Sequence, residues 1–200
     1  MTQKTSFYQQ IAEIAALPPR ERHQRLAALH ADVVAGYCAG VQAIDAEAAA
    51  RTGPDGRSVA QVIGHIAQWD RYAILAAGEM LAGVAYPRII NNGGYIEPDG
   101  GERAFEGVAE FNAYQAARHA TWPWEDIRDL AVRSATALQA LFAHPALLSP
   151  ELIEQTSSYT FTLGDVLTLT TPVGWYVWII TIEHEAIEHV DEVGWGYGDR

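Results

Sequence analysis

The segment TIEHEAIEHVDE, residues 181 to 192, places two histidines and five carboxylates close together near the end of the chain. Imidazole nitrogens and carboxylate oxygens are ligands that ions such as Zn²⁺, Ni²⁺ and Fe²⁺ accept in proteins. Glu185 precedes His189 by four residues, and this spacing brings two side chains onto one face of a helix. The segment can therefore supply two ligands of a metal site if that face turns inward.

A helical wheel predicts which of these side chains face the core, because an α-helix turns by about 100° per residue. In the last helix His189 falls inside the apolar stripe and Glu185 lies on its shoulder. His184 and Glu188 fall on the opposite face, where we expect water or a partner subunit. The stripe consists of Trp175, Trp178, Ile179, Ile182, Ala186, Val190 and Val193.

A third ligand is expected from an earlier helix. In the segment GHIAQWDRY, His65 lies at the edge of a stripe formed by Val62, Ile66, Trp69 and Ala73. A histidine on a facing helix can complete a set with Glu185 and His189. Three ligands of this kind leave coordination positions open for water or substrate, as in catalytic sites.

Simpler interpretations of the same residues stay open. Glu185 and His189 can form a local ion pair between positions i and i+4. His65 can be a histidine at the edge of the core that bonds a carbonyl group. No partner spacing is found for the other histidines, which are assigned to the surface or to helix ends; they are His23, His30, His119 and His144.

The elements that must position these residues are predicted to be helices, because apolar residues recur with a helical period over most of the chain. Capping residues mark several helix starts, including Ser58 with Gln61 and Thr121-Trp122-Pro123. A short opening helix is expected to stop at Leu17-Pro18-Pro19. The remaining helices are expected at about Glu21–Ala50, Ser58–Ala85, Ala104–His119, residues 123–144, a short piece from Ser149-Pro150, and Pro172 to the glycine-rich residues 194–198.

Four long amphipathic helices predict an all-α four-helix bundle that forms one domain over residues 1–200. Residues 158–163 alternate and favour a brief extended strand. The long loop after the second of these helices, residues 86–103, is rich in Gly, Asn and Pro, and such loops often carry binding residues. Arg88 and Tyr95 are its candidates for contacting a substrate or cofactor.

Composition excludes several classes of function. The formal net charge of −12 disfavours binding to nucleic acid, and no basic run compensates for it. Cys38 is the only cysteine, which excludes an internal disulfide framework. No apolar run is long enough to span a membrane, and the first residues lack the apolar core of a signal peptide. We therefore expect a soluble, cytoplasmic protein.

The chain resembles the DinB-like (YfiT-like) superfamily of metal-binding four-helix bundles. SVAQVIGHIAQWDRY is similar to that family's second-helix segment, in which a ligand histidine precedes an aromatic residue by four positions, as His65 precedes Trp69. EFNAY and SATALQAL resemble its middle region. EHEAIEHVDEV resembles the last-helix motif H-x-x-x-H, whose second histidine corresponds to His189.

Position 185 departs from this motif, because Glu185 stands four residues before His189 where the family usually has histidine. The mycothiol-dependent maleylpyruvate isomerases are similar in using a His, Glu, His set. A register in which His184 replaces Glu185 as the ligand also stays open, although the helical wheel favours Glu185.

The resemblance implies a divalent metal (Zn, Ni or Fe) and, in some members, a low-molecular-weight thiol. The expected function is that of a metal-dependent enzyme, a thiol S-transferase or hydrolase acting on a small molecule. The alternative is a non-catalytic helical stress-response or binding module with a structural metal or ion pair. The apolar, tryptophan-rich C-terminal end and the outward position expected for His184 favour a homodimer.

Overall fold

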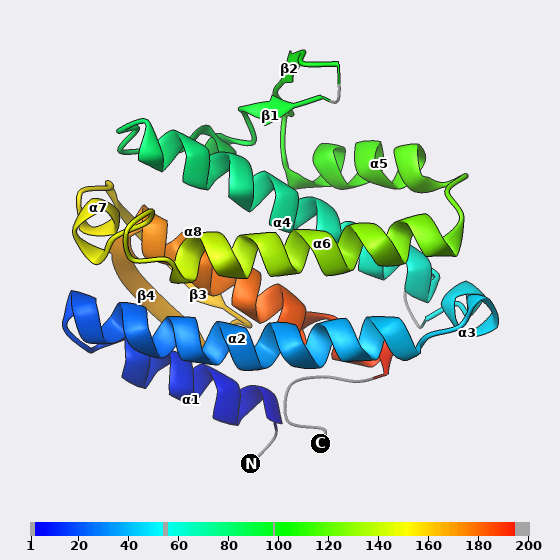
Figure 1. Cartoon of the computed structure of the whole chain (residues 1–200), viewed down its shortest axis with the longest axis horizontal. Helices are drawn as coiled ribbons and strands as arrows, with labels where there is room; N and C mark the ends of the chain where they lie inside the picture. The colour runs from blue at the N-terminus through cyan, green and yellow to red at the C-terminus, as the bar shows by residue number, and fades with distance from the viewer. Residues whose placement is uncertain (1–2, 54–55, 98, 195–200) are drawn as a thin grey trace.

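The computed structural model describes residues 3–53, 56–97 and 99–194, and in this part the chain is mostly helical with two small sheets (Figure 1). The helical prediction is therefore confirmed in this coarse form. Of the glycine-rich end predicted for the last helix, only Gly194 belongs to the described residues.

The longest helices run lengthwise beside one another (Figure 1). α2 and α4 both pack on α6, and α8 contacts α4 and α2. α8 continues into η2, one turn of π-helix, and then into α9. The bounds of these elements are α2 (Pro19–Ala43), α4 (Val59–Leu81), α6 (Trp124–Ala143), α8 (Val173–Glu183), η2 (His184–Glu188) and α9 (Val190–Val193).

Shorter helices surround this group: α1 (Gln3–Ala15), α3 (Ala46–Ala50), α5 (Val108–His119) and α7 (Pro150–Glu154). The helix predicted over residues 21–50 is interrupted after Ala43, because Asp45 leaves the helical conformation and caps α3 by accepting a hydrogen bond from Ala48 N at 2.8 Å. The predicted capping box of α4 is confirmed. Ser58 Oγ accepts from Gln61 N at 3.2 Å, and Ser58 N donates to Gln61 Oε1 at 2.7 Å.

Two antiparallel hairpins modify the all-α prediction. The expected strand at residues 158–163 is confirmed as β3 (Ser158–Leu163), but its partner β4 (Leu167–Pro172) was not predicted. Threonines stabilise the pair, with hydroxyl oxygens of Thr160 and Thr170 2.8 Å apart. The predicted loop 86–103 also has local structure: a 3₁₀-helix, η1 (Arg88–Asn91), and the short strands β1 (Tyr95–Ile96) and β2 (Glu102–Arg103).

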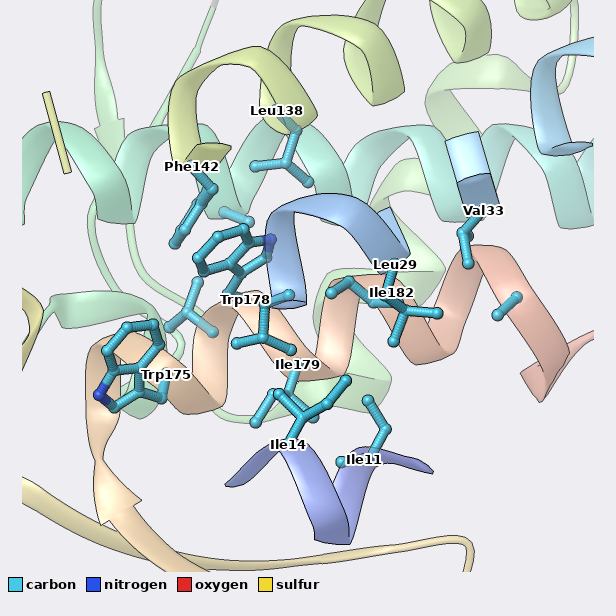
Figure 2. Close-up of a cluster of buried hydrophobic side chains, with 14 of the residues drawn as sticks. Ile11, Ile14, Leu29, Val33, Leu138, Phe142, Trp175, Trp178, Ile179 and Ile182 are labelled. Atoms are coloured by element: carbon cyan, nitrogen blue, oxygen red, sulfur yellow. The ribbon is translucent and has the colours of Figure 1, made fainter. Parts of the chain in front are cut away.

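The apolar stripe of α8 forms the centre of the core (Figure 2). Trp178 lies against Phe142 of α6, with ring centroids 5.4 Å apart, and Ile182 lies near Leu29 of α2. Both faces of α8 are thus covered, and its side chains are almost all buried. None of the described helices combines the length and apolarity needed to cross a bilayer.

Candidate metal centre

Three histidines converge where η2 passes α4. His65, His184 and His189 each offer a ring nitrogen, and these three atoms lie within 4.8 Å of one another. The Nε2 atoms of His65 and His184 are 3.2 Å apart. A tetrahedral zinc site with Zn–N bonds of about 2.0–2.1 Å separates its nitrogens by about 3.4 Å. The separation of the His65 and His184 nitrogens fits two ligands of one ion, and the nitrogen of His189 lies within 4.8 Å of both.

The structure corrects the predicted position of His184. On a regular α-helix, the side chains of residues 184 and 189 are about 140° apart around the helix axis, so they face different directions. η2 instead has hydrogen bonds from i to i+5, and its wider turn brings positions five residues apart onto one face. His184 therefore turns toward His65 and His189, and only 13% of its side chain is exposed. The outward position that favoured a dimer through His184 is not observed.

Glu185, predicted as a ligand, does not belong to the cluster. Its side chain points to α2, where Oε2 lies 3.1 Å from His30 Nε2, and both side chains are fully buried. Trp178 Nε1 donates to His30 Nδ1 at 3.0 Å, so the Nε2 atom of His30 carries the proton and donates to Glu185. Burial raises the pKa of Glu185 well above its usual range and lowers that of His30 to about 3. Burial thus disfavours the charged form of both groups.

In His184 and His189, the ring nitrogen Nδ1 lies at hydrogen-bond distance from a carboxylate oxygen. Glu188 Oε2 is 2.8 Å from His184 Nδ1, and Glu192 Oε1 is 3.2 Å from His189 Nδ1. Arg57 Nη2 in turn donates to Glu192 Oε1 at 3.0 Å. Because each carboxylate accepts the proton on Nδ1, the Nε2 lone pair is directed to the other side of the ring, as in histidines that bind metals.

His189 Nε2 supplies a further test of this interpretation. This atom is buried and has no hydrogen-bond partner. A buried polar atom without a partner is costly, and each such atom calls for a ligand, a water or an ion that completes it. Three imidazoles, one of them with an unsatisfied nitrogen, are a donor set that can hold a divalent transition metal.

The pKa shifts keep two of the three imidazoles neutral. Burial, with the neighbouring histidines, lowers the pKa of His65 to about 3 and that of His189 by a smaller amount. At His184 burial also opposes the charge, but the hydrogen bond and the charge of Glu188 outweigh burial and raise the pKa. Burial alone would raise the pKa of Glu188, but the hydrogen bond and charge of His184 outweigh burial and lower the pKa of Glu188 to about 2. Neutral imidazoles are the metal-binding form.

A cavity of about 280 Å³ adjoins the cluster. His184 and Glu188 form part of its wall, next to Trp69 of α4. The indole of Trp69 lies 6.2 Å from the ring of His184 and donates through Nε1 to Asn112 Oδ1 at 3.1 Å. A small molecule in the cavity would therefore reach the edge of the histidine cluster.

The two loop candidates lie elsewhere. Arg88 forms ion pairs with Glu79 and Glu102, and its backbone N donates to Glu79 Oε2 at 2.7 Å. Tyr95 is only 1% exposed; it packs against Phe111, and its hydroxyl accepts from Arg118 Nη1 at 3.1 Å. Neither side chain lines the cavity.

Instead, the loop contributes Ile89, Ile90 and Asn92 to the cavity. The two adjacent isoleucines within a Gly- and Asn-rich stretch were the signal that sequence reasoning missed. The assignment of the other histidines to the surface or to helix ends is wrong for His23 and His30, which are buried within α2. His119 is buried, but it is the last residue of α5 and therefore lies at a helix end, as expected. His144 is exposed, as expected.

Comparison of the chain with protein-family models, with characterised proteins and with solved structures found no match.

Proposed function

We propose that the protein is a metal-dependent enzyme of the thiol S-transferase or hydrolase type, in which His65, His184 and His189 bind a divalent ion such as Zn²⁺, Ni²⁺ or Fe²⁺. The observation that carries the proposal is the buried, unpartnered Nε2 atom of His189 within a cluster of three imidazole nitrogens. Lengthwise packing of four long helices and the places of His65 and His189 on two of them support a DinB-like bundle.

A bound ion would supply Lewis-acid chemistry, lowering the pKa of a coordinated thiol or water so that a nucleophile exists at neutral pH. The chain contributes the arrangement around it. Glu188 and Glu192 hold the rings of His184 and His189 in position through Nδ1. The apolar cavity limits water on the side of His184, and a low-molecular-weight thiol or a small substrate would bind there.

The alternative is a non-catalytic helical module in which the metal only stiffens the fold. Structural zinc sites have four protein ligands and no open position. Among the described residues the cluster has three candidate ligands, and a cavity adjoins it. These two observations favour the catalytic proposal.

The test is elemental analysis of protein purified without added metal, followed by titration of chelator-treated protein with Zn²⁺. The wild-type chain is expected to bind about one ion, and His189→Ala to lose that binding. His144→Ala is the matched control, since His144 is exposed and lies outside the cluster. Equal zinc affinities for the wild-type chain and His189→Ala, with both folded by circular dichroism, would remove the basis of the proposal.

A further inference from the structure

We propose that the cavity beside His184 binds a small molecule with an aromatic or alicyclic ring body and a neutral or cationic polar end, and that it discriminates against anions. That this molecule is the substrate rests on the proposed function. Its binding to the cavity does not, because the cavity walls are formed by the chain alone.

Rings and branched aliphatic side chains form most of the wall. Trp69 comes from α4, Tyr159 from β3 and Tyr176 from α8, so three separate elements present aromatic groups. The rings of Tyr159 and Tyr176 are 4.7 Å apart and brace each other. The aliphatic part consists of Ala73, Ile89, Ile90, Val108, Val177 and Ile180. Such a lining favours a ligand whose body is apolar and ring-shaped.

The titratable histidine and carboxylate of the wall, His184 and Glu188, lie where it meets the histidine cluster, and Asn92 adds an amide from the loop. The hydroxyl groups of Tyr159 and Tyr176 are also polar. The hydroxyl of Thr181 already donates within α8, to the carbonyl oxygens of Val177 and Trp178. A ligand would therefore place its polar end toward His184 and its ring toward Trp69 and Tyr176.

Charge selects the kind of polar end. Glu188 is the one carboxylate in the wall, and none of the residues described as lining the cavity is Lys or Arg. The imidazole of His184 is already paired through Nδ1 with Glu188 Oε2 at 2.8 Å, so it is not a free cationic partner for an anion. Burial of an anion without such a partner is unfavourable, and the carboxylate adds repulsion. An amine or a hydroxyl can instead donate to Glu188 Oε1. The cavity is therefore suited to neutral or cationic ligands.

The volume of the cavity limits the size of the ligand. An engineered cavity of about 150 Å³ in another protein binds benzene. The cavity here, at about 280 Å³, is nearly twice as large and fits a bicyclic ring system with one short substituent.

One wall of the cavity is held in place by contacts outside it. η1 carries Ile89 and Ile90, and Arg88 at its start is bound to Glu79 of α4. Further along the loop, the hydroxyl of Tyr72 donates to the carbonyl oxygen of Gly93. These anchors fix η1 against α4, so the cavity exists before a ligand binds, and little ordering is needed on binding.

Three naphthalene probes of matched size test the inference: naphthylmethylamine, naphthylmethanol and naphthoate. Binding is measured by isothermal titration calorimetry with chelator-treated, full-length protein. The amine and the alcohol are expected to bind, and naphthoate to bind at least about tenfold more weakly, a difference of about 1.4 kcal/mol. Equal binding of all three probes, or a preference for naphthoate, would overturn the inference.

Two variants localise the binding. Ile180→Phe fills the cavity and is expected to abolish binding, whereas Val166→Phe, at a turn residue that is 69% exposed, is the matched control. Glu188→Gln is expected to remove the discrimination against naphthoate. If Ile180→Phe is folded and binds the amine as wild type does, the probes occupy another place and the inference fails.

The same measurements separate this inference from the proposed function. Binding of the alcohol to metal-free protein, together with no zinc binding, would retain the cavity and remove the enzyme. Zinc binding without binding of any probe would retain the metal site and remove the cavity inference.

Discussion

His184 and Glu185 are neighbours in the chain, but they serve two different sides of the molecule. His184 turns to α4, where it joins His65 and His189 beside a cavity. Glu185 turns to α2, where it pairs with His30, and neither side chain has any exposed surface. Both sides contain histidine and glutamate at hydrogen-bond distance, so residue type alone does not distinguish them.

The difference lies in which ring nitrogens are left without partners, because the atom without a partner in the pair on the α2 side, Oε1 of Glu185, belongs to a carboxyl group. On the α2 side, both ring nitrogens of His30 are used, one by Trp178 and one by Glu185. On the α4 side, the Nδ1 atoms of His184 and His189 meet carboxylates, while His189 Nε2 meets none. A histidine with both nitrogens satisfied is structural, whereas His189, whose inner nitrogen is free beside the paired Nε2 atoms of His65 and His184, is prepared for a ligand.

The largest expected effect is on zinc affinity, when His184 and Glu185 are substituted one at a time. His184→Gln removes an imidazole ligand, and its zinc affinity is expected to fall by more than the roughly 10–100-fold that loss of an outer partner costs. Glu185→Gln retains an oxygen that accepts from His30 and is expected to bind zinc as wild type does. Competition titrations with a chelating dye measure both affinities.

The reverse result would also be decisive. If Glu185→Gln loses zinc while His184→Gln keeps it, the carboxylate is the ligand and the α4 side is not the metal centre. The last helix would then have to be wound as a regular α-helix in solution, and the π-turn of η2 would be absent.

The α2 side is expected to dominate stability. His30→Ala leaves the N–H group of Trp178 and the carboxyl group of Glu185 without their partner in the core. Each buried polar group that loses its partner costs about 1–3 kcal/mol in free energy of unfolding. Urea denaturation is expected to show this loss for His30→Ala, whereas the exposed His144→Ala should unfold with the wild-type midpoint. A midpoint unchanged in both variants would contradict a structural role for the pair.

The carboxylates outside the histidine cluster give a smaller effect. Glu192→Gln weakens the acceptor of His189 Nδ1 and releases Arg57. The zinc affinity is expected to fall about 10–100-fold, as for other outer partners of histidine ligands. Asp191→Asn is the adjacent control, because Asp191 has an 81% exposed side chain. Equal affinities for the two variants would show that Glu192 does not act through His189.

Local sequence signals predicted many of the helix starts and inward-facing residues on the two sides of the molecule. Ser58 and Gln61 predicted the start of α4, and Ser149 predicted the start of α7. In the structure the Ser149 hydroxyl accepts from Leu152 N at 3.1 Å. His65 and His189 were placed correctly toward the interior. Each of these predictions depended on residues within a few positions of one another, where spacing determines geometry.

The remainder depended on contacts that spacing does not encode. His184 was misplaced because a wheel assumes a constant rotation per residue, and η2 breaks that assumption in one turn. Glu185 was assigned to the metal because its true partner, His30, is 155 positions away. Tyr95 was predicted to contact a substrate or cofactor, although the loop folds back and buries its ring against Phe111. Local backbone geometry decided the first of these three, and tertiary packing decided the other two.

The two sides are also expected to differ in the pH dependence of stability. In the folded protein burial lowers the pKa of His30 to about 3, against an ordinary value of 6.5. Below about pH 6.5 the unfolded chain therefore takes up a proton that the folded chain does not, and stability falls until about pH 3, by about 1.4 kcal/mol per pH unit. The pKa of His184 is raised, so its contribution is complete below pH 6.5 and is lost as the pH rises through the folded value.

His30→Gln separates these two windows in chelator-treated protein. The variant is expected to be less stable at every pH, but its stability should fall less steeply between pH 6.5 and pH 3. His65 and His119, whose pKa values burial also lowers, titrate in both proteins and cancel in the comparison. Parallel profiles for the two proteins would mean that His30 is protonated in the folded state. The α2 side would then be an ion pair with Glu185, and the contrast with the α4 side would rest on the free nitrogen of His189 alone.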